Sequence, residues 1–278
     1  MTASLTPGPA SARVEAAFFD LDKTVISRAS LLAFGARFFQ EGLITRRTVA
    51  RSLWAQLVYR YLGANERRLR RLERSVLHVT QGWQQSVVRR VVSEALTEII
   101  TPLIYREAVE LMELHRLAGR KVYLISASPE EIVEPLATFL GVDGQIASRP
   151  KVDAEGVYTG EMEFYAYGPY KAEAMLRIAA QEGIDLARSY AYSDSYTDLP
   201  MLEAVGHPVA VNPDRVLARV ARERGWEVLE FRHHTKVGHH VLLRTLGAVA
   251  IGLGIAALPA APLLRRLARR PLAHARSR

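Results

Sequence analysis

Hydrophobic residues occur along most of the chain in short runs that are separated by longer amphipathic stretches. The short runs predict buried strands at 16–20, 121–126, 189–194, 208–212 and 227–231. The stretches 103–119 and 171–182 repeat their apolar positions with the period of an α-helix. Apolar strands that alternate with helices predict an α/β fold, in which a parallel sheet is covered on both faces and ligands bind beyond the carboxyl ends of the strands.

The region between residues 30 and 100 departs from this alternation. It contains no run typical of a strand. Its apolar positions follow helical periods in four segments, 31–39, 47–62, 66–79 and 86–100. An all-helical insertion between the first and second predicted strands is expected to form a cap over the strand ends. Farther along, residues 152–161 alternate around Glu155 and Gly156 and predict a β-hairpin.

These patterns divide the chain into a core, an inserted cap and two terminal segments. We expect a flexible N-terminal tail at 1–12, a catalytic core at 13–29 and 101–231, a helical cap at 30–100, and a basic, apolar C-terminal segment at 232–278. The first dozen residues are small and rich in proline and glycine, which is typical of a loose end. The predicted fold is a Rossmann-like parallel sheet with a helical cap after its first strand, plus an apolar C-terminal helix.

The net charge suggests nucleic-acid binding until its distribution is considered. The chain carries a formal net charge of +8, but nine of its 37 basic residues and none of its 29 acidic residues lie in 232–278. The preceding 231 residues hold 28 basic and 29 acidic side chains, a net charge of −1. A nucleic-acid-binding domain normally presents a basic face on its folded body, so we expect no nucleic-acid partner. The chain has no cysteine, which excludes disulfides and thiolate metal sites.

The first candidate chemistry lies at the end of the first predicted strand, in the sequence FFDLDKT at 18–24. Side chains of a strand alternate between its two faces, so Asp20 and Asp22 are expected on the same side. Hydrolysis of a phosphomonoester needs an anionic nucleophile, an acid for the leaving oxygen, and positive charge that offsets repulsion from the phosphate. Two neighbouring carboxylates fit the first two needs. Alone, such a pair is also found in ordinary polar turns.

Three further polar segments follow in order, each next to a strand end or a helix start. Ser126 and Ala127 end the second predicted strand, Lys171 begins a helix, and Asp194 and Asp198 follow a later strand. Each has an ordinary explanation by itself, such as a strand-ending serine, a surface lysine or an aspartate that caps a helix. The ordered set of four segments is much harder to explain by chance than any one of them.

In these four segments the sequence resembles the haloacid dehalogenase (HAD) superfamily, specifically its subfamily IB hydrolases, which are similar to phosphoserine phosphatases. The resemblance extends over residues 14–231. It implies that Asp20 is the nucleophile and that Asp22 is the general acid and then the general base. It also implies that Ser126, the backbone N–H of Ala127 and the side chain of Lys171 bind the phosphoryl oxygens.

The same resemblance implies Mg²⁺ as the cofactor. Its ligands would be the Asp20 carboxylate, the Asp22 backbone carbonyl and Asp194, with Asp198 supporting them. Hard oxygen ligands beside a phosphate suit Mg²⁺, which commonly keeps several bound waters. The carboxylate of Asp22 also favours an oxygen leaving group, since dehalogenase-like members of the superfamily lack it.

The resulting hypothesis is a Mg²⁺-dependent phosphomonoester hydrolase that acts on a small or lipid-derived phosphate through an aspartyl-phosphate. Phosphoserine phosphatases resembling this chain recognise the amino acid with a glutamate shortly after the nucleophile, but no acid occurs here between Asp22 and Glu41. Phosphoserine hydrolysis therefore stays an alternative, as does phosphotransfer to another alcohol. A non-catalytic binding module would predict loss of at least one of the four segments, and all four are present. The sequence does not indicate an oligomeric state.

Residues 245–264 form an uncharged, largely apolar run of 20 positions, which is long enough to cross a hydrocarbon core. Basic residues flank the run on both sides, whereas Pro259 and Pro262 interrupt it. A transmembrane helix, an interfacial membrane anchor and docking on the folded body are open alternatives. The N-terminus shows no secretory signal, so the catalytic body is expected in the cytoplasm. In either membrane alternative it would then be attached to the cytoplasmic face of the membrane.

Overall fold

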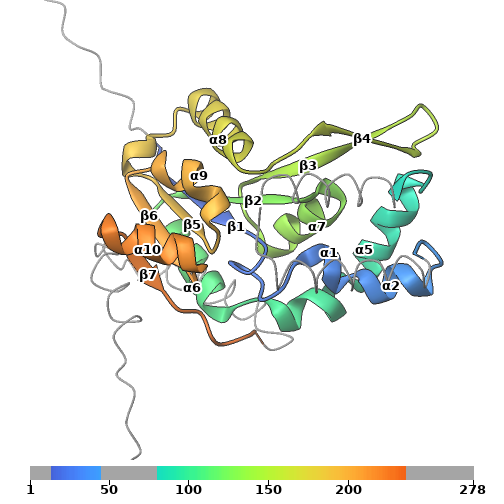
Figure 1. The fold of residues 1–278 in the computed structure, drawn as a ribbon, viewed down its shortest axis with the longest axis horizontal. Coiled ribbons are helices and arrows are strands. Elements are labelled where there is room, and N and C mark those ends of the chain that lie inside the picture. The colour runs from blue at the N-terminus through green and yellow to red at the C-terminus, as the bar shows by residue number, and fades with distance from the viewer. Residues whose placement is uncertain (1–13, 45–79, 236–278) are drawn as a thin grey trace, which may run out of the picture.

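The computed structural model describes residues 14–44 and 80–235, which contain a seven-stranded sheet (Figure 1). Its strands are β1 (Ala16–Asp20), β2 (Lys121–Pro129), β3 (Gly144–Val152), β4 (Tyr158–Phe164), β5 (Tyr190–Ser193), β6 (His207–Val211) and β7 (Glu227–Leu229). The strand order is β4-β3-β2-β1-β5-β6-β7, and all neighbours are parallel except β3 and β4. The predicted α/β class is confirmed, and β1 lies at the centre between β2 and β5.

Helices cover both faces of this sheet (Figure 1). The described helices are α1 (Ser30–Ala33), α2 (Gly35–Gln40), α5 (Gln85–Ile100), α6 (Arg106–Leu117), α7 (Glu130–Leu140), α8 (Pro169–Glu182), α9 (Leu199–Glu203) and α10 (Arg215–Glu223), with 3-10 turns η1 (Thr101–Leu103), η2 (Leu186–Arg188) and η3 (Tyr196–Asp198). Helices α6 and α7 contribute to the hydrophobic cluster on one face of the sheet, and α8, α9 and α10 contribute to the cluster on the other face.

The central strand connects these two clusters. All five residues of β1 are buried; Ala17 and Phe19 belong to the α6–α7 cluster, while Ala16 and Phe18 belong to the cluster formed with α8, α9 and α10. A strand covered on both faces has no polar side, which explains its continuous apolar sequence. Because β1 is buried between the two clusters, the position of its end is fixed in the core.

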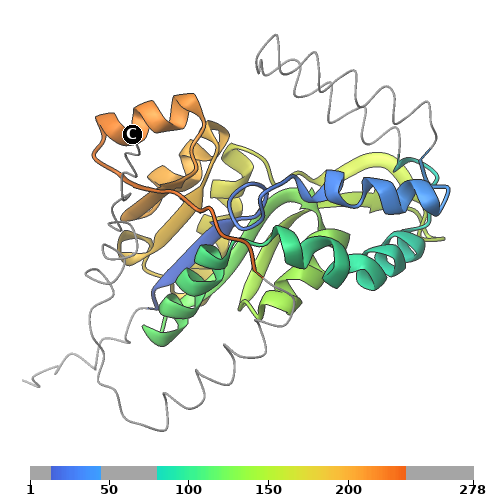
Figure 2. The same cartoon turned by 90° about the horizontal axis from the view of Figure 1, so that it is seen from below.

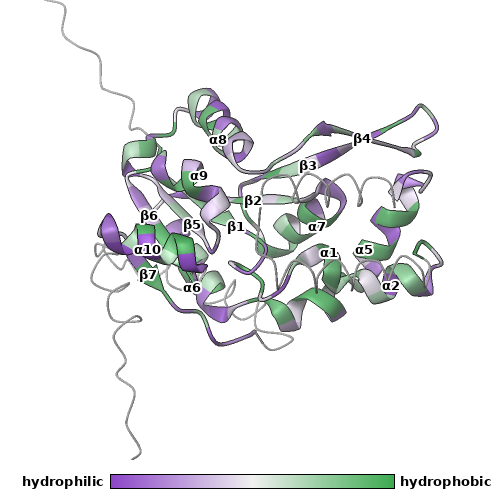
Figure 3. Cartoon of the chain, in the orientation of Figure 1, coloured by the Kyte–Doolittle hydropathy of each residue, from purple (hydrophilic) through white to green (hydrophobic). Residues whose placement is uncertain are grey.

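Figure 3 shows the contrast between α7, which is largely hydrophobic, and the projecting β3–β4 hairpin, where hydrophilic residues are frequent.

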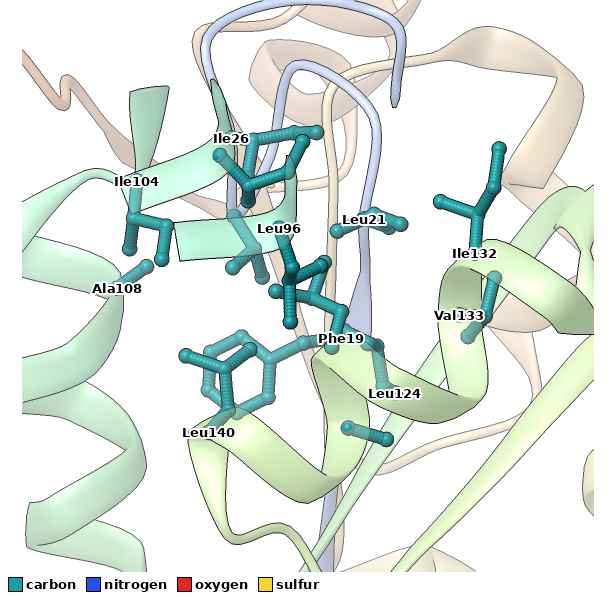
Figure 4. Packing of buried hydrophobic residues seen from close by; sticks show 14 of the residues in the cluster. Phe19, Leu21, Ile26, Leu96, Ile104, Ala108, Leu124, Ile132, Val133 and Leu140 are labelled. Carbon is teal, nitrogen blue, oxygen red and sulfur yellow. The ribbon is translucent and has the colours of Figure 1, made fainter. Parts of the chain in front are cut away.

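The described part of the region 30–100 is helical and packs onto the core. Helices α1, α2 and α5 lie against one another (Figure 2). Figure 4 shows Leu96 of α5 in the same packed cluster as Phe19 of β1 and Ala108 of α6. Because α5 shares one hydrophobic cluster with the sheet, a change in its position would disturb packing around β1.

The structure agrees only in part with the helices predicted for residues 30–100. The segment 86–100 corresponds to α5, whereas 31–39 is divided into α1 and α2 by the buried Phe34. The predicted helices at 47–62 and 66–79 lie outside the described residues. The division into a core and a separate cap stays a prediction.

The β3–β4 hairpin is larger than the sequence pattern predicted. Its turn contains Gly156, whose φ of +75° lies in the left-handed region that favours glycine. The paired strands extend on both sides of the predicted 152–161, and β3 itself was not predicted. Proline and charged residues interrupt the apolar pattern of β3, so its strand conformation depends on pairing with β2 and β4.

Residues 232–235 contact the segment that leads from α5 into α6. The Thr235 N–H donates to the Ile104 carbonyl at 2.9 Å, and the Thr235 hydroxyl donates to the Thr101 carbonyl at 2.7 Å. The Arg106 N–H donates to the His233 carbonyl at 2.8 Å. The beginning of the predicted C-terminal segment therefore packs on the folded body.

Within residues 14–44 and 80–235, no helix is both long enough and apolar enough to cross a membrane. The predicted apolar C-terminal helix and membrane segment, 245–264, lies outside the described residues.

His115 is expected to make folding stability depend on pH. It is buried among aromatic rings, its Nε2 lies 2.8 Å from the Tyr192 hydroxyl, and its Nδ1 has no hydrogen-bond partner among the described residues. Burial, assisted by the charge of Arg120, lowers the pKa of His115 to about 3. At pH values between this pKa and the pKa near 6.5 of the unfolded state, only the unfolded state binds the proton. The contribution of His115 to the free energy of unfolding is therefore fully present above pH 6.5 and falls as the pH decreases.

The size of this effect follows from the linkage relation. The contribution of His115 to the free energy of unfolding should fall by about 2 kcal/mol between pH 7 and pH 5. Urea denaturation at several pH values should show a shallower pH dependence for His115→Gln, which keeps a polar group opposite Tyr192 but has no proton to gain. Identical slopes for the variant and the wild type would contradict this assignment.

Candidate active site

Asp20 ends the central strand and is buried there. Its Oδ1 accepts a hydrogen bond from Lys171 Nζ at 2.6 Å, and its Oδ2 accepts one from the Thr24 hydroxyl at 3.2 Å. Burial raises the pKa of Asp20 well above its usual range; Lys171 opposes this rise, and Asp198 and Asp194 add to it. The carboxylate predicted as the nucleophile is thus in direct contact with the lysine predicted to bind phosphate.

Lys171 enters the site from the first turn of α8. Gly168 precedes the helix with a φ of +55°, a conformation that favours glycine. The lysine side chain is buried, and its Nζ also donates to Asp198 Oδ2 at 2.8 Å. Burial alone would lower the pKa of Lys171, but the charges of Asp198 and Asp20 outweigh it and raise that pKa. Lys171 is therefore a fixed positive charge beside the ends of β1 and β5.

Asp194 and Asp198 follow β5 and are linked to Asp20 through hydroxyl groups and the lysine. The Ser193 hydroxyl donates to Asp198 Oδ2 at 2.8 Å, and the Asp194 N–H donates to the Thr24 hydroxyl at 3.0 Å. Since that hydroxyl also donates to Asp20, Thr24 connects the two strand ends. Burial raises the pKa of Asp194 to about 7; Lys23 and Lys171 oppose this rise, and Asp198 and Asp214 add to it.

Asp22 lies in the turn after β1. The strand ends at Asp20, and Lys23 has a φ of +67°, so strand alternation does not decide the direction of the Asp22 side chain. Its Oδ1 accepts a hydrogen bond from the Ser30 N–H at 2.7 Å, and its Oδ2 accepts one from the Ser128 hydroxyl at 2.9 Å. Two contacts orient this carboxylate, one from the start of α1, eight residues along the chain, and one from β2, 106 residues away.

Ser126 and Ala127 lie where β2 leaves its regular pairing with β3. The register between the two strands shifts after Ile125, which is the residue opposite Asp20 in the adjacent strand. The buried Ser126 hydroxyl accepts a hydrogen bond from the Ser128 N–H at 3.0 Å. Both predicted phosphate-binding residues therefore lie at the carboxyl end of β2, beside the carboxyl end of β1.

A protein-family model for haloacid dehalogenase-like hydrolases matches residues 17–203, from β1 to α9. The chain belongs to the haloacid dehalogenase-like hydrolases. The matched range includes all four segments that suggested this family from the sequence.

Relatives of this HAD hydrolase include named phosphatases. It is 45% identical over 273 residues to a probable phosphatase of Mycobacterium tuberculosis, covering 96% of this chain and 95% of that protein. It is 36% identical over 245 residues to a phosphoserine phosphatase of the same species, covering 87% and 79%. An "inhibition of morphological differentiation protein" of Streptomyces azureus is 49% identical over 226 residues, covering 81% and 82%. These comparisons confirm the predicted enzyme class, a phosphatase of the HAD superfamily.

A solved structure supports the fold of the HAD hydrolase. A protein of unknown function from Bordetella pertussis superposes with a TM-score of 0.68 at 27% identity, covering 78% of this chain and 99% of that one. The common architecture agrees with the mostly parallel sheet and its helices.

The charges of the HAD hydrolase site fit a divalent cation. Asp20, Asp194 and Asp198 are buried around one lysine, Lys171, so the cluster keeps an excess of negative charge. Burial is the main cause of the raised pKa values of Asp20 and Asp194, and the neighbouring carboxylate Asp198 adds to both. Among the residues that the structure describes, no three acidic or histidine side chains form a ready-made metal cage. The expected Mg²⁺ ligands include only two such side chains, and the rest would be a backbone carbonyl and water.

Several residues of the site received no role from the sequence. Thr24 belongs to the 18–24 motif, and Ser193 directly precedes Asp194, so sequence position was a usable signal for both. Ser30 follows Asp22 by eight residues and Ser128 is 106 residues away from it, and no motif or periodicity indicated either contact.

Proposed function

We propose that this HAD hydrolase is a Mg²⁺-dependent phosphomonoesterase that acts through an aspartyl-phosphate on Asp20. The observation that carries this proposal is the buried contact between Asp20 and Lys171 at the end of the central strand. A carboxylate in this position can attack phosphorus, while the lysine offsets the charge of the phosphate oxygens.

The chain supplies a group for each proton and each bond change. Asp20 attacks phosphorus, the bond from phosphorus to the leaving oxygen breaks, and Asp22 gives its proton to that oxygen. The Asp22 carboxylate then takes a proton from the water that attacks the phosphorus of the aspartyl-phosphate, which releases phosphate and restores Asp20. Ser126, the Ala127 N–H and Lys171 hold the phosphoryl oxygens through both steps.

The Asp20 carboxylate, the Asp22 backbone carbonyl and Asp194 would hold Mg²⁺, and Asp198 would keep Lys171 in place beside them. When bound, the metal offsets negative charge on the attacking carboxylate and on the transferred group. The excess of buried carboxylates over lysine in this cluster supports the assignment.

The substrate class is a phosphorylated small molecule, either soluble or lipid-derived. The named phosphoserine phosphatase among the relatives supports phosphoserine as one candidate. Against it, no acidic residue between Asp22 and Glu41 is available to meet an ammonium group. Transfer of the phosphoryl group to an alcohol other than water would use the same residues and is the second candidate reaction.

A panel of monophosphates tests the proposal. Purified protein should release phosphate from at least one member of a set that contains phosphoserine, simple alkyl phosphates and lipid phosphates. EDTA should abolish release and added Mg²⁺ should restore it, while product analysis with added alcohols would detect phosphotransfer. No release from any member in the presence of Mg²⁺ would refute the proposed activity.

We further propose that residues 245–264 attach the catalytic body to the cytoplasmic face of a membrane. The proposal rests on the apolar sequence of this run and its basic flanks. A truncation after Lys236 should move the protein from the membrane pellet to the supernatant on sedimentation. Truncation after Phe231 is a poorer test, because it also deletes Thr235, which binds the backbone near α6. The untruncated chain, residues 1–278, found wholly in the supernatant would refute the attachment.

A further inference from the structure

The Asp22 carboxylate is held by contacts on both of its oxygens. The Ser30 N–H donates to Oδ1 at 2.7 Å, and the Ser128 hydroxyl donates to Oδ2 at 2.9 Å. The hydroxyl groups of Ser30 and Ser128 lie 2.8 Å apart, and both serines are buried. The three residues form a closed network that joins the turn after β1, the start of α1 and the end of β2.

Two separate donors on one carboxylate determine the plane of that group. Rotation of the Asp22 carboxylate would break at least one of these hydrogen bonds, and an unpaired buried polar group is costly. General acid catalysis needs this kind of fixed direction, because the proton must pass to an oxygen within hydrogen-bonding reach. The network therefore has the geometry to aim Asp22 at a leaving group.

The Ser30 hydroxyl supports this arrangement through Ser128. It lies within hydrogen-bonding distance of the Ser128 hydroxyl, and either serine can be the donor in that contact. The contact restricts the Ser128 hydroxyl, which in turn contacts Asp22 Oδ2.

We propose that Ser128 is a positioning residue that aims the Asp22 carboxyl at the leaving oxygen, and that the Ser30 hydroxyl supports it through Ser128. This inference rests on the proposed function of Asp22 as the general acid. It assigns to Ser128 a role in protonating the alcohol and no role in binding the phosphate or in the attack by Asp20.

The leaving group provides a readout that a purely structural role would not change. An alkoxide needs a proton as it departs, whereas p-nitrophenolate is stable at neutral pH without one. In Ser128→Ala, kcat/KM for an alkyl phosphate should fall about tenfold or more, while kcat/KM for p-nitrophenyl phosphate should fall by less than about threefold. The ratio kcat/KM is used because it covers the steps up to departure of the alcohol and excludes the later hydrolysis.

Further variants separate positioning from loss of structure. Ser128→Thr keeps the hydroxyl and should restore the wild-type preference between the two substrates, even if both rates decline. Ser30→Ala should change that preference less than Ser128→Ala. The double variant Ser30→Ala/Ser128→Ala should change it no more than Ser128→Ala, because one hydroxyl acts through the other.

Ser148 offers a matched control. It is a buried serine whose hydroxyl donates to the Ala127 carbonyl at 2.7 Å and accepts from the Ala166 N–H at 3.1 Å, with no contact to Asp22. Ser148→Ala should affect both substrates by the same factor.

Equal loss on both substrates in Ser128→Ala, or a changed preference in Ser148→Ala, would overturn the inference. The proposed function is tested separately by Asp20→Asn, which should lose activity on both substrates. The failure of one can therefore be distinguished from the failure of the other.

Discussion

Replacement of Asp20 by asparagine is expected to reduce phosphate release by on the order of 10⁴-fold or more, because an amide cannot serve as the anionic nucleophile. The substitution keeps the size of the side chain, and Lys171 still has its second partner, Asp198, at 2.8 Å. The folded structure should therefore survive. Steady-state phosphate release with saturating Mg²⁺ measures the loss, and circular dichroism verifies the fold.

A covalent trapping experiment extends this prediction. Wild-type protein quenched in acid with a ³²P-labelled substrate should carry a label that hydroxylamine removes, as expected for an acyl phosphate, and Asp20→Asn should carry none. The control is Asp153→Asn, which makes the same chemical change in the exposed β3–β4 turn and should keep full activity. Wild-type turnover in Asp20→Asn would exclude this residue as the nucleophile.

Replacement of Lys171 by methionine is expected to damage both stability and activity. The lysine lies 2.6 Å from Asp20 and 2.8 Å from Asp198, and all three side chains are buried. Removal of the cation leaves two buried carboxylates without their partner, which costs about 3–5 kcal/mol in comparable buried ion pairs. Urea denaturation in the absence of metal should show a loss of this order. In the presence of Mg²⁺, kcat/KM should fall by about 10²-fold or more because one charge contact to the phosphate is lost.

Lys151→Met provides the matched control for this second prediction. Lys151 also forms an ion pair, with Glu161 at 2.8 Å, but both side chains are exposed on the β3–β4 hairpin. Water screens such a pair, so its removal should leave unfolding and activity unchanged. If Lys171→Met proved as stable and as active as Lys151→Met, the buried cluster would not have the electrostatic role assigned to it.

The strands were predictable because their signal is local. The bounds predicted for the first strand, 16–20, agree with β1, and the strands at 121–126, 189–194, 208–212 and 227–231 correspond to β2, β5, β6 and β7. A strand buried on both faces needs a continuous apolar run, and such a run can be read from a few neighbouring residues. β3 has no such run, and it was missed.

The sequence predicted which residues belong to the candidate site, but it did not predict all of the contacts among them. The contact of Asp20 with Lys171 was expected, because the four segments lie next to strand ends or helix starts, and parallel strands place their carboxyl ends on the same side of the sheet. The orientation of Asp22 was not predictable in this way. Ser128 is 106 residues away from it along the chain, and strand alternation does not apply beyond the end of β1.

The sequence alone determined which chemical groups this phosphatase possesses and which strand ends carry them, because composition and period are properties of neighbouring residues. Only the tertiary structure decided which groups touch and in what state of charge. Asp194 is an ordinary aspartate in the sequence, and in the folded protein burial raises its pKa to about 7 while the nearby charges act in both directions. Desolvation and Coulomb energies depend on distances through space, and those distances exist only after the strand ends have been brought together.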